Sequence, residues 1–162
     1  VAAIAVVNSN GSAVDPTTAL PWERHSLRLT RPSINERNSV RSVLANQAAV
    51  GLNTTIGVVV TSAALDKAEC SKVAAVAHDG LARAIRPAHS MTDGDTVFTL
   101  ATGDTNLPAH VNNSTRFAAI NQILRAGADV FSAACTHAVV SATTIGDTPA
   151  WRDLCPNTLA AC

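Results

Sequence analysis

The sequence has few aromatic residues and no charge excess. Only 3% of its 162 residues are aromatic, and Tyr is missing altogether. Proteins that bind single-stranded nucleic acid rely on aromatic side chains as stacking platforms. The formal net charge is zero, so the chain has no broad positive field to attract nucleic acid or anionic membranes. We therefore expect neither nucleic acid nor a membrane as a partner.

The sequence also lacks membrane, secretion and redox signals. No segment approaches the roughly 20 apolar residues that span a bilayer, and no basic segment precedes a secretory apolar one. The four cysteines, Cys70, Cys135, Cys155 and Cys162, form no Cys-x-x-Cys pair, so a zinc or redox site is not indicated. We expect Cys70 and Cys135 to be buried thiols. A disulfide between Cys155 and Cys162 stays open. Together these features favour a cytoplasmic protein.

Small apolar residues are abundant, and their spacing predicts strands that alternate with helices. Hydrophobic residues make up 47% of the chain, and their spacing predicts strands at 1–7, 54–61 and 96–102 and helices at 64–85 and 114–141. Strands alternating with helices predict an α/β fold with layered (α+β) packing. The first strand is apolar at nearly every position, so we expect it to be covered on both faces.

The remaining segments carry weaker signals. Residues 12–33 contain three prolines and predict a surface loop. Residues 33–50 have weak helical character and are expected to form a mobile linker leading to the next strand. The tail, 146–162, predicts a loop or a short cap. The chain starts with an apolar strand and no initiator Met, as expected if a longer protein continues upstream.

One strand begins in an unusual way. Residues 51–61 read GLNTTIGVVVT, so small and flexible residues lead into Thr54, which opens a β-branched strand. A plain buried strand after a turn has the same pattern. The alternative is a nucleophile that the chain frees by cutting itself. A Thr hydroxyl needs a base, and a free α-amino group has a pKa of about 7.7–8, so an N-terminal Thr would carry both.

Three later segments support the second interpretation. AHDGLARAI at 77–85, RPAH at 86–89 and DGDTVF at 93–98 follow the first run in order. Over residues 1–12 and 51–103 the sequence resembles the family that contains L-aminopeptidase/D-esterase, the β-aminopeptidases and nylon oligomer hydrolase. Members of that family cut themselves just before a Ser or Thr, which becomes the N-terminal nucleophile. The matching bond here joins Asn53 and Thr54.

The resemblance also implies a fold and a chain organisation. It implies an αββα sandwich, helix–sheet–sheet–helix, with the nucleophile at a strand end between the sheets. Residues 1–53 would then be the end of the α chain, as a strand plus linker, and residues 54–162 the β chain. The sequence would hold only the C-terminal part of such a protein. The upstream part supplies further active-site groups in the family, a lysine or tyrosine depending on the member, and has no counterpart here.

The residues DGD at 93–95 have two interpretations. Asp-Gly is ordinary turn chemistry. By resemblance, Asp93 and Asp95 match an acidic pair that lies close to the nucleophile in nylon oligomer hydrolase, where one acid takes up a proton or orients the amine. Of the two acids, we favour Asp95 slightly for this role. Asn8 also has two interpretations: it forms a turn or, as the resemblance implies, its amide donates a hydrogen bond to the oxyanion. Asn10 is nearly as well placed for the second role.

Other polar residues near these motifs receive smaller roles. We expect His78 to be structural, His89 to pack against the Asp93–Asp95 turn, and Thr55 to help orient the cleaved N-terminus. The sequence shows no cluster of three or four convergent metal ligands, and we expect neither a metal nor a cofactor.

The function that the resemblance implies is a serine/threonine-type aminopeptidase or amidase acting on small peptides or amides through an acyl-enzyme on Thr54. Two alternatives remain: an acyltransferase of the ornithine acetyltransferase type, and a non-catalytic, uncleaved domain. The resemblance further implies a homo-oligomer of αβ units, commonly a tetramer of such pairs. The acyl preference, whether for α-, β- or D-amino acid amides or polyamides, stays open.

Overall fold

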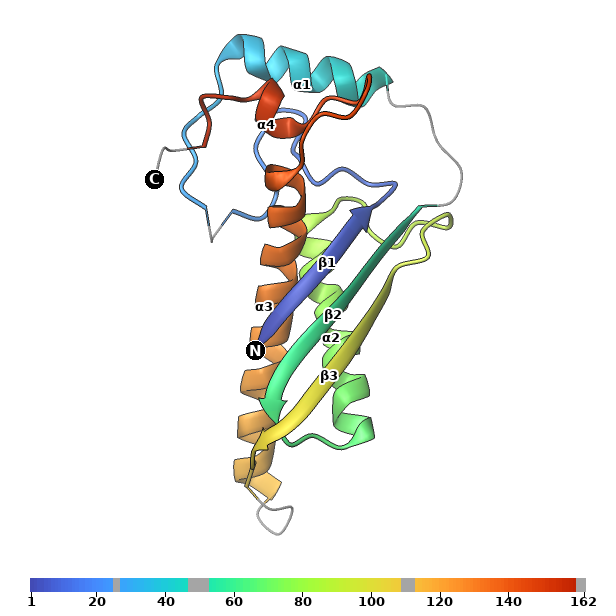
Figure 1. The fold of residues 1–162 in the computed structure, drawn as a ribbon, viewed down its shortest axis with the longest axis vertical. Coiled ribbons are helices and arrows are strands. Elements are labelled where there is room, and N and C mark those ends of the chain that lie inside the picture. The colour runs from blue at the N-terminus through green and yellow to red at the C-terminus, as the bar shows by residue number, and fades with distance from the viewer. Residues whose placement is uncertain (25–26, 47–52, 109–112, 160–162) are drawn as a thin grey trace.

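A computed structural model describes residues 1–24, 27–46, 53–108 and 113–159. Three strands and four helices follow one another along the chain (Figure 1): β1 Ala2–Asn8, α1 Ile34–Asn46, β2 Thr54–Ala63, α2 Lys67–Ala84, β3 Thr96–Thr105, α3 Asn113–Ser141 and α4 Trp151–Leu154. The α/β class predicted from the sequence is confirmed, and each predicted strand and helix is present.

The three strands form one sheet in the order β1-β2-β3. β1 runs antiparallel to β2, with Asn8 opposite Thr54. β2 runs parallel to β3, and α2 makes the crossover between them. The end of β1 and the beginnings of β2 and β3 therefore meet at one edge of the sheet, which brings the segments 8–12, 53–55 and 89–96 together.

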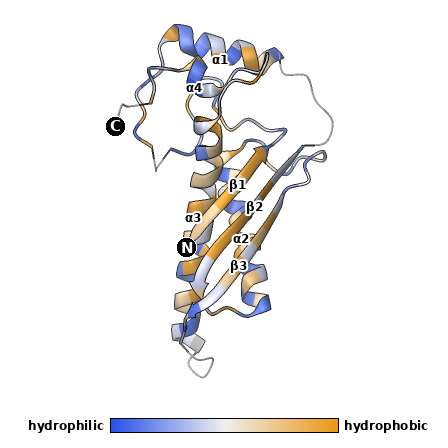
Figure 2. Ribbon diagram, in the orientation of Figure 1, coloured by the Kyte–Doolittle hydropathy of each residue, from blue (hydrophilic) through white to orange (hydrophobic). Residues whose placement is uncertain are grey.

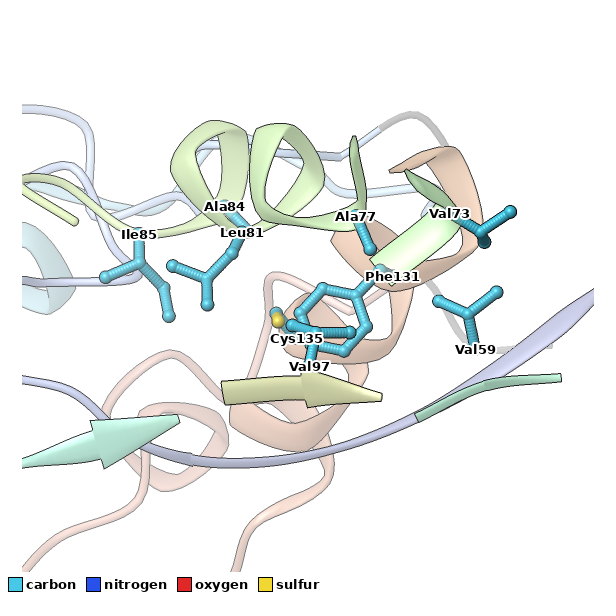
Figure 3. Packing of buried hydrophobic residues seen from close by; sticks show 9 residues of the cluster. All are labelled: Val59, Val73, Ala77, Leu81, Ala84, Ile85, Val97, Phe131 and Cys135. Carbon is cyan, nitrogen blue, oxygen red and sulfur yellow. The ribbon is translucent and has the colours of Figure 1, made fainter. Parts of the chain in front are cut away.

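Helices α2 and α3 cover one face of the sheet. Their apolar residues close a core around Phe131, with Val59 from β2, Val97 from β3 and Leu81 from α2 (Figure 3). Gly57 makes room for this packing, because a Cβ at that position would lie 2.1 Å from the Phe131 ring. α3 is long and apolar enough to be a candidate membrane span, but here it packs against α2, β1 and β2.

The opposite face of the sheet is apolar and exposed. Ile4 and Val6 are each 67% exposed, and Phe98 is 60% exposed; Figure 2 shows the hydrophobic colouring of the strands. The described residues of this chain therefore do not supply the cover expected on both faces of the first strand. Among the described residues, the elements that pack on the sheet are α2 and α3, which lie on its other side.

A second apolar cluster lies beyond the end of the sheet, under α1 and α4. Val14 and Ala19 pack there with Val40 and Trp151. The described residues between 12 and 33 are thus not simply a surface loop, since Val14 and Ala19 are buried in this cluster. The linker prediction for 33–50 is corrected over 34–46, which is a helix. Ser33 explains its start, because its hydroxyl accepts the Glu36 N–H while the Glu36 carboxylate accepts the Ser33 N–H, as in a capping box.

Three cysteines lie in the described part of the chain, and all are free thiols. Cys135 and Cys155 are buried, whereas Cys70 is partly exposed. Burial raises the pKa of the Cys135 thiol to about 12, so this thiol stays protonated at neutral pH. Cys162, the possible disulfide partner of Cys155, lies outside the described residues.

Candidate active site

The bond between Asn53 and Thr54 lies at the first residue of β2. The carbonyl oxygen of Asn53 accepts a hydrogen bond from the main-chain N–H of Gly94 over 2.8 Å. The same oxygen accepts the Thr54 hydroxyl over 2.6 Å. The N–H of Asn53 donates to the carbonyl of Thr92. The loop before β3 therefore holds Asn53 through both its N–H and its carbonyl, and the Thr54 hydroxyl lies beside that carbonyl.

Gly94 lies unusually close to the hydroxyl. A Cβ at position 94 would be 3.0 Å from Thr54 Oγ1 and 3.8 Å from the Asn53 carbonyl oxygen. Glycine thus allows the backbone N–H to approach the Asn53 carbonyl without crowding Thr54. The acids on either side of Gly94 were candidates from the sequence and the glycine itself was not, although its place between them was the available signal.

The side chain of Asp93 links the segment after β1 to the loop before β3 by hydrogen bonds. Its carboxylate accepts the N–H of Asn10 over 3.0 Å, and the N–H and hydroxyl of Ser90 over 3.0 and 2.7 Å. Burial acts to raise the pKa of Asp93, but these hydrogen bonds and the nearby His89 outweigh it, so the pKa lies below its ordinary value. The group is therefore a carboxylate at neutral pH.

Asp95 holds the start of β2. One carboxylate oxygen accepts the N–H of Thr55 over 2.8 Å, and the other lies 2.8 Å from Nδ1 of His89. Its side chain is only 3% exposed. Within the described part of the chain, neither Asp93 nor Asp95 is hydrogen-bonded to the Thr54 hydroxyl. Both carboxylates fix main-chain segments around Thr54.

The two asparagines at the end of β1 occupy different positions. Asn8 is the cross-strand partner of Thr54, and directly opposed residues in a sheet point to the same face. Its side chain is exposed on the open face of the sheet. Asn10 instead contacts the acidic loop, since its N–H donates to Asp93 and its side-chain amide donates to Ser90. Asn8 is thus the asparagine that lies next to Thr54.

His89 was not a candidate site residue from the sequence, but it contacts Asp95 in the structure. Its ring contacts Asp95, and its centroid lies 4.9 Å from that of His78 on α2. Burial is the main cause that lowers the pKa of His78, and the charge of His89 lowers it further. The prediction that His89 packs against the Asp93–Asp95 turn is confirmed by the hydrogen bond to Asp95.

A cavity of about 270 Å³ opens beside Asn8. Its walls come from β1, the segment after it, α1 and α4, and include Val7, Val40, Leu44 and Trp151. The side chains that line it carry no formal charge. The indole N–H of Trp151 is already bonded to the carbonyl of Ala19, so this residue adds an apolar surface. Such a lining suits an uncharged group.

Residues 1–150 match the sequence model of peptidase family S58. The chain belongs to this family. It is 38% identical to an uncharacterized aminopeptidase of Mycobacterium tuberculosis over 167 residues, which cover 96% of this chain and 48% of the relative. A second uncharacterized aminopeptidase, from Mycobacterium leprae, is 40% identical over 166 residues, covering 96% of this chain and 44% of its own length. The chain therefore spans slightly less than half of these relatives.

A shorter match links the chain to a named polyamide hydrolase. The 6-aminohexanoate-oligomer endohydrolase of Paenarthrobacter ureafaciens is 36% identical over 62 residues, which are 38% of this chain and 18% of that protein. The family inferred from the sequence motifs is thus confirmed. The matched family is a peptidase family, and these relatives carry the names aminopeptidase and endohydrolase.

Proposed function

We propose that this chain is the C-terminal part of a self-processing N-terminal-nucleophile hydrolase that is cleaved between Asn53 and Thr54. The observation that carries the proposal is the geometry of that bond. Its carbonyl oxygen accepts the Gly94 N–H over 2.8 Å and the Thr54 hydroxyl over 2.6 Å. A main-chain N–H aimed at a carbonyl oxygen stabilises the negative charge that develops when the carbonyl carbon is attacked.

Self-cleavage begins as an N-to-O acyl shift in this proposal. The Thr54 oxygen bonds to the carbonyl carbon of Asn53 while the carbonyl oxygen becomes an oxyanion beside the Gly94 N–H. The C–N bond then breaks, and the proton from the hydroxyl ends on the Thr54 amine. Water hydrolyses the resulting ester, which leaves a carboxylate on Asn53 and restores the Thr54 hydroxyl next to a free α-amine.

Turnover uses the same threonine in a second role. The freed amine of Thr54 serves as the base for its own hydroxyl, because an α-amine titrates near neutral pH. The hydroxyl attacks a substrate amide and forms an acyl-enzyme that water cleaves. Asn8, the cross-strand neighbour of Thr54, supplies an amide donor for the oxyanion. Asp93 and Asp95 lie beside this part of the chain and favour uptake of the hydroxyl proton by the new amine during attack. The amine then passes that proton to the departing amine of the substrate.

The exposed face of the sheet supports the expected αββα sandwich. Thr54 and Asn8 lie at the edge of an apolar surface that includes Ile4, Val6 and Phe98. We propose that a second sheet, from the part of the protein that the longer relatives have and this chain lacks, covers this surface and places the nucleophile between two sheets. We further propose a cytoplasmic homo-oligomer of processed αβ units that acts on small peptides or amides.

Replacement of the nucleophile tests the proposal. In the full-length protein, Thr54→Ala is expected to abolish both self-cleavage and amide hydrolysis, because it removes the attacking oxygen of each step. Thr54→Ser keeps a hydroxyl and should retain part of both activities. Ser62→Ala, which removes another hydroxyl from β2 far from the site, is the matched control and should behave as wild type. Normal cleavage of the Thr54→Ala protein would overturn the assignment.

A further inference from the structure

His89 lies outside the residues assigned to bond breaking, yet it belongs to a continuous chain of contacts that ends beside the nucleophile. Its Nδ1 is 2.8 Å from one oxygen of Asp95, and the other oxygen of Asp95 accepts the N–H of Thr55 over 2.8 Å. We propose that His89 is a positioning residue, which orients Asp95 so that Thr55, and with it Thr54, is fixed for attack. This inference rests on the proposed function only for its consequence in catalysis.

The burial of Asp95 makes the contact important. Its side chain is 3% exposed, whereas that of His89 is 41% exposed. A buried carboxylate requires a partner for each oxygen, because an unsatisfied buried polar group carries a large desolvation cost. Here the two partners are the Thr55 N–H and the His89 ring. Without the ring, the carboxylate would turn toward solvent to satisfy its second oxygen, and the hydrogen bond to Thr55 would weaken.

The backbone of His89 indicates that its neighbours hold it in place. Its φ is 56°, in the left-handed region that costs energy for most residues with a side chain. Residues in such conformations persist where the surroundings over-determine them, and they cluster at functional sites. The surroundings here are Asp95 on one side and the His78 ring of α2 on the other, 4.9 Å between centroids and tilted by 53°.

The charges around His89 fit a donor role in both protonation states. The ionisable groups that face it are Asp95, Asp93 and His78, and Asp79 lies next to His78 on α2. A neutral imidazole with its proton on Nδ1 donates to Asp95, as does the imidazolium form. The hydrogen bond to the carboxylate, rather than the positive charge, is therefore what positions Asp95. A neutral side chain that offers a donor at the same place should replace the histidine.

Two substitutions distinguish the contribution of the His89 side chain from that of its backbone conformation. Glycine tolerates a positive φ but offers no donor, so His89→Gly removes the hydrogen bond without backbone strain. Asparagine also tolerates this conformation, and its amide donor can take the place of Nδ1, so His89→Asn keeps both properties. His137 is exposed on α3, and His137→Asn serves as the matched control.

The first measurement does not depend on cleavage. In the full-length Thr54→Ala protein, NMR measures the hydrogen exchange rate of the Thr55 amide, which reports local opening. We expect His89→Gly to accelerate this exchange by about tenfold or more, and His89→Asn and His137→Asn to leave it within a factor of about three. Unchanged exchange in His89→Gly would overturn the proposal, as would His89→Asn exchanging as fast as His89→Gly. Should His89→Gly fail to fold, exchange in His89→Asn accelerated by about tenfold or more would still overturn the proposal.

The second measurement follows cleavage in proteins that retain Thr54. A displacement of about 1 Å can cost about 100-fold in rate, so His89→Gly should slow self-cleavage by about 10- to 100-fold, and His89→Asn should restore most of the rate. Equal cleavage rates in wild type and His89→Gly would contradict the positioning role. A wild-type protein that never cleaves would contradict the proposed function, while the amide exchange of Thr55 would still decide the role of His89.

Discussion

The main-chain N–H of Gly94 donates a 2.8 Å hydrogen bond to the carbonyl oxygen of Asn53. The two residues come from loops that precede the neighbouring parallel strands β2 and β3. This contact polarises the carbonyl beside which the Thr54 hydroxyl lies, at 2.6 Å from its oxygen. The main-chain N–H of Gly94 is therefore a hydrogen-bond donor to the carbonyl of the peptide bond that we propose is cut.

Gly94→Ala is expected to slow self-cleavage by roughly tenfold, because the added methyl group would lie 3.0 Å from Thr54 Oγ1 and displace either the hydroxyl or the Gly94 N–H. Gly127→Ala is the control, since its Cβ would meet Val73 at 3.4 Å, far from the site. Gel densitometry of precursor and product over time gives both rates. Wild-type cleavage of the Gly94→Ala protein would show that this close approach is unimportant.

Asp95→Asn and Asp93→Asn test the acidic pair. We expect Asp95→Asn to slow cleavage and amide hydrolysis by about 10²–10⁴-fold, the usual contribution of a positioned acid–base group. Asp93→Asn should have a smaller effect, because Asp93 binds Asn10 and Ser90 rather than β2. Circular dichroism should show an intact fold in both variants. If both work at the wild-type rate, the pair is merely a structural turn.

Acid should destabilise the fold through His78. Burial and the charge of His89 hold the pKa of His78 below its ordinary value of 6.5, so the unfolded chain binds more protons than the folded one once the pH falls below about that value. This contribution to stability is present above pH 6.5 and is lost progressively below it. Urea unfolding between pH 7.5 and 5 should show the decline, and His78→Phe should reduce its slope. Identical slopes in the two proteins would contradict the assignment.

The order of strands and helices was predictable because it depends on local apolar spacing and on prolines that end helices. Phe131 and Leu81 are buried, as the helical period required. The linker prediction failed over α1 because that helix is mostly polar, with only Glu36 and Val40 buried. The Ser33–Glu36 capping box was the local signal available.

The candidate site was predictable only in part. Thr54 and the two acids stand out by residue type, but a hydrogen bond from the Gly94 backbone depends on strand register, which the sequence does not display. The contact between His89 and Asp95 depends on a left-handed backbone at His89, which is uncommon outside glycine. Similarly, Asn8 and Asn10 became distinct only when the pairing of β1 with β2 placed Asn8 opposite Thr54.

Association of this chain in isolation follows from its open sheet face. Ile4, Val6 and Phe98 expose contiguous apolar surface, which favours self-association in water. Light scattering at micromolar concentration should detect oligomers or aggregates, and the double variant Val6→Thr and Phe98→Thr should reduce them. A monodisperse monomer would refute the expectation. For the full-length protein we predict an oligomer of αβ units, and a monomeric αβ unit would refute that prediction.

The most direct test of the account is the covalent state of the full-length protein after purification and prolonged incubation. Intact-mass spectrometry combined with N-terminal sequencing locates any cleavage to a single bond. We predict two chains, the second of which begins at Thr54. A single uncleaved chain, or a second chain that begins at any other residue, would contradict the assignment of Thr54 as the nucleophile.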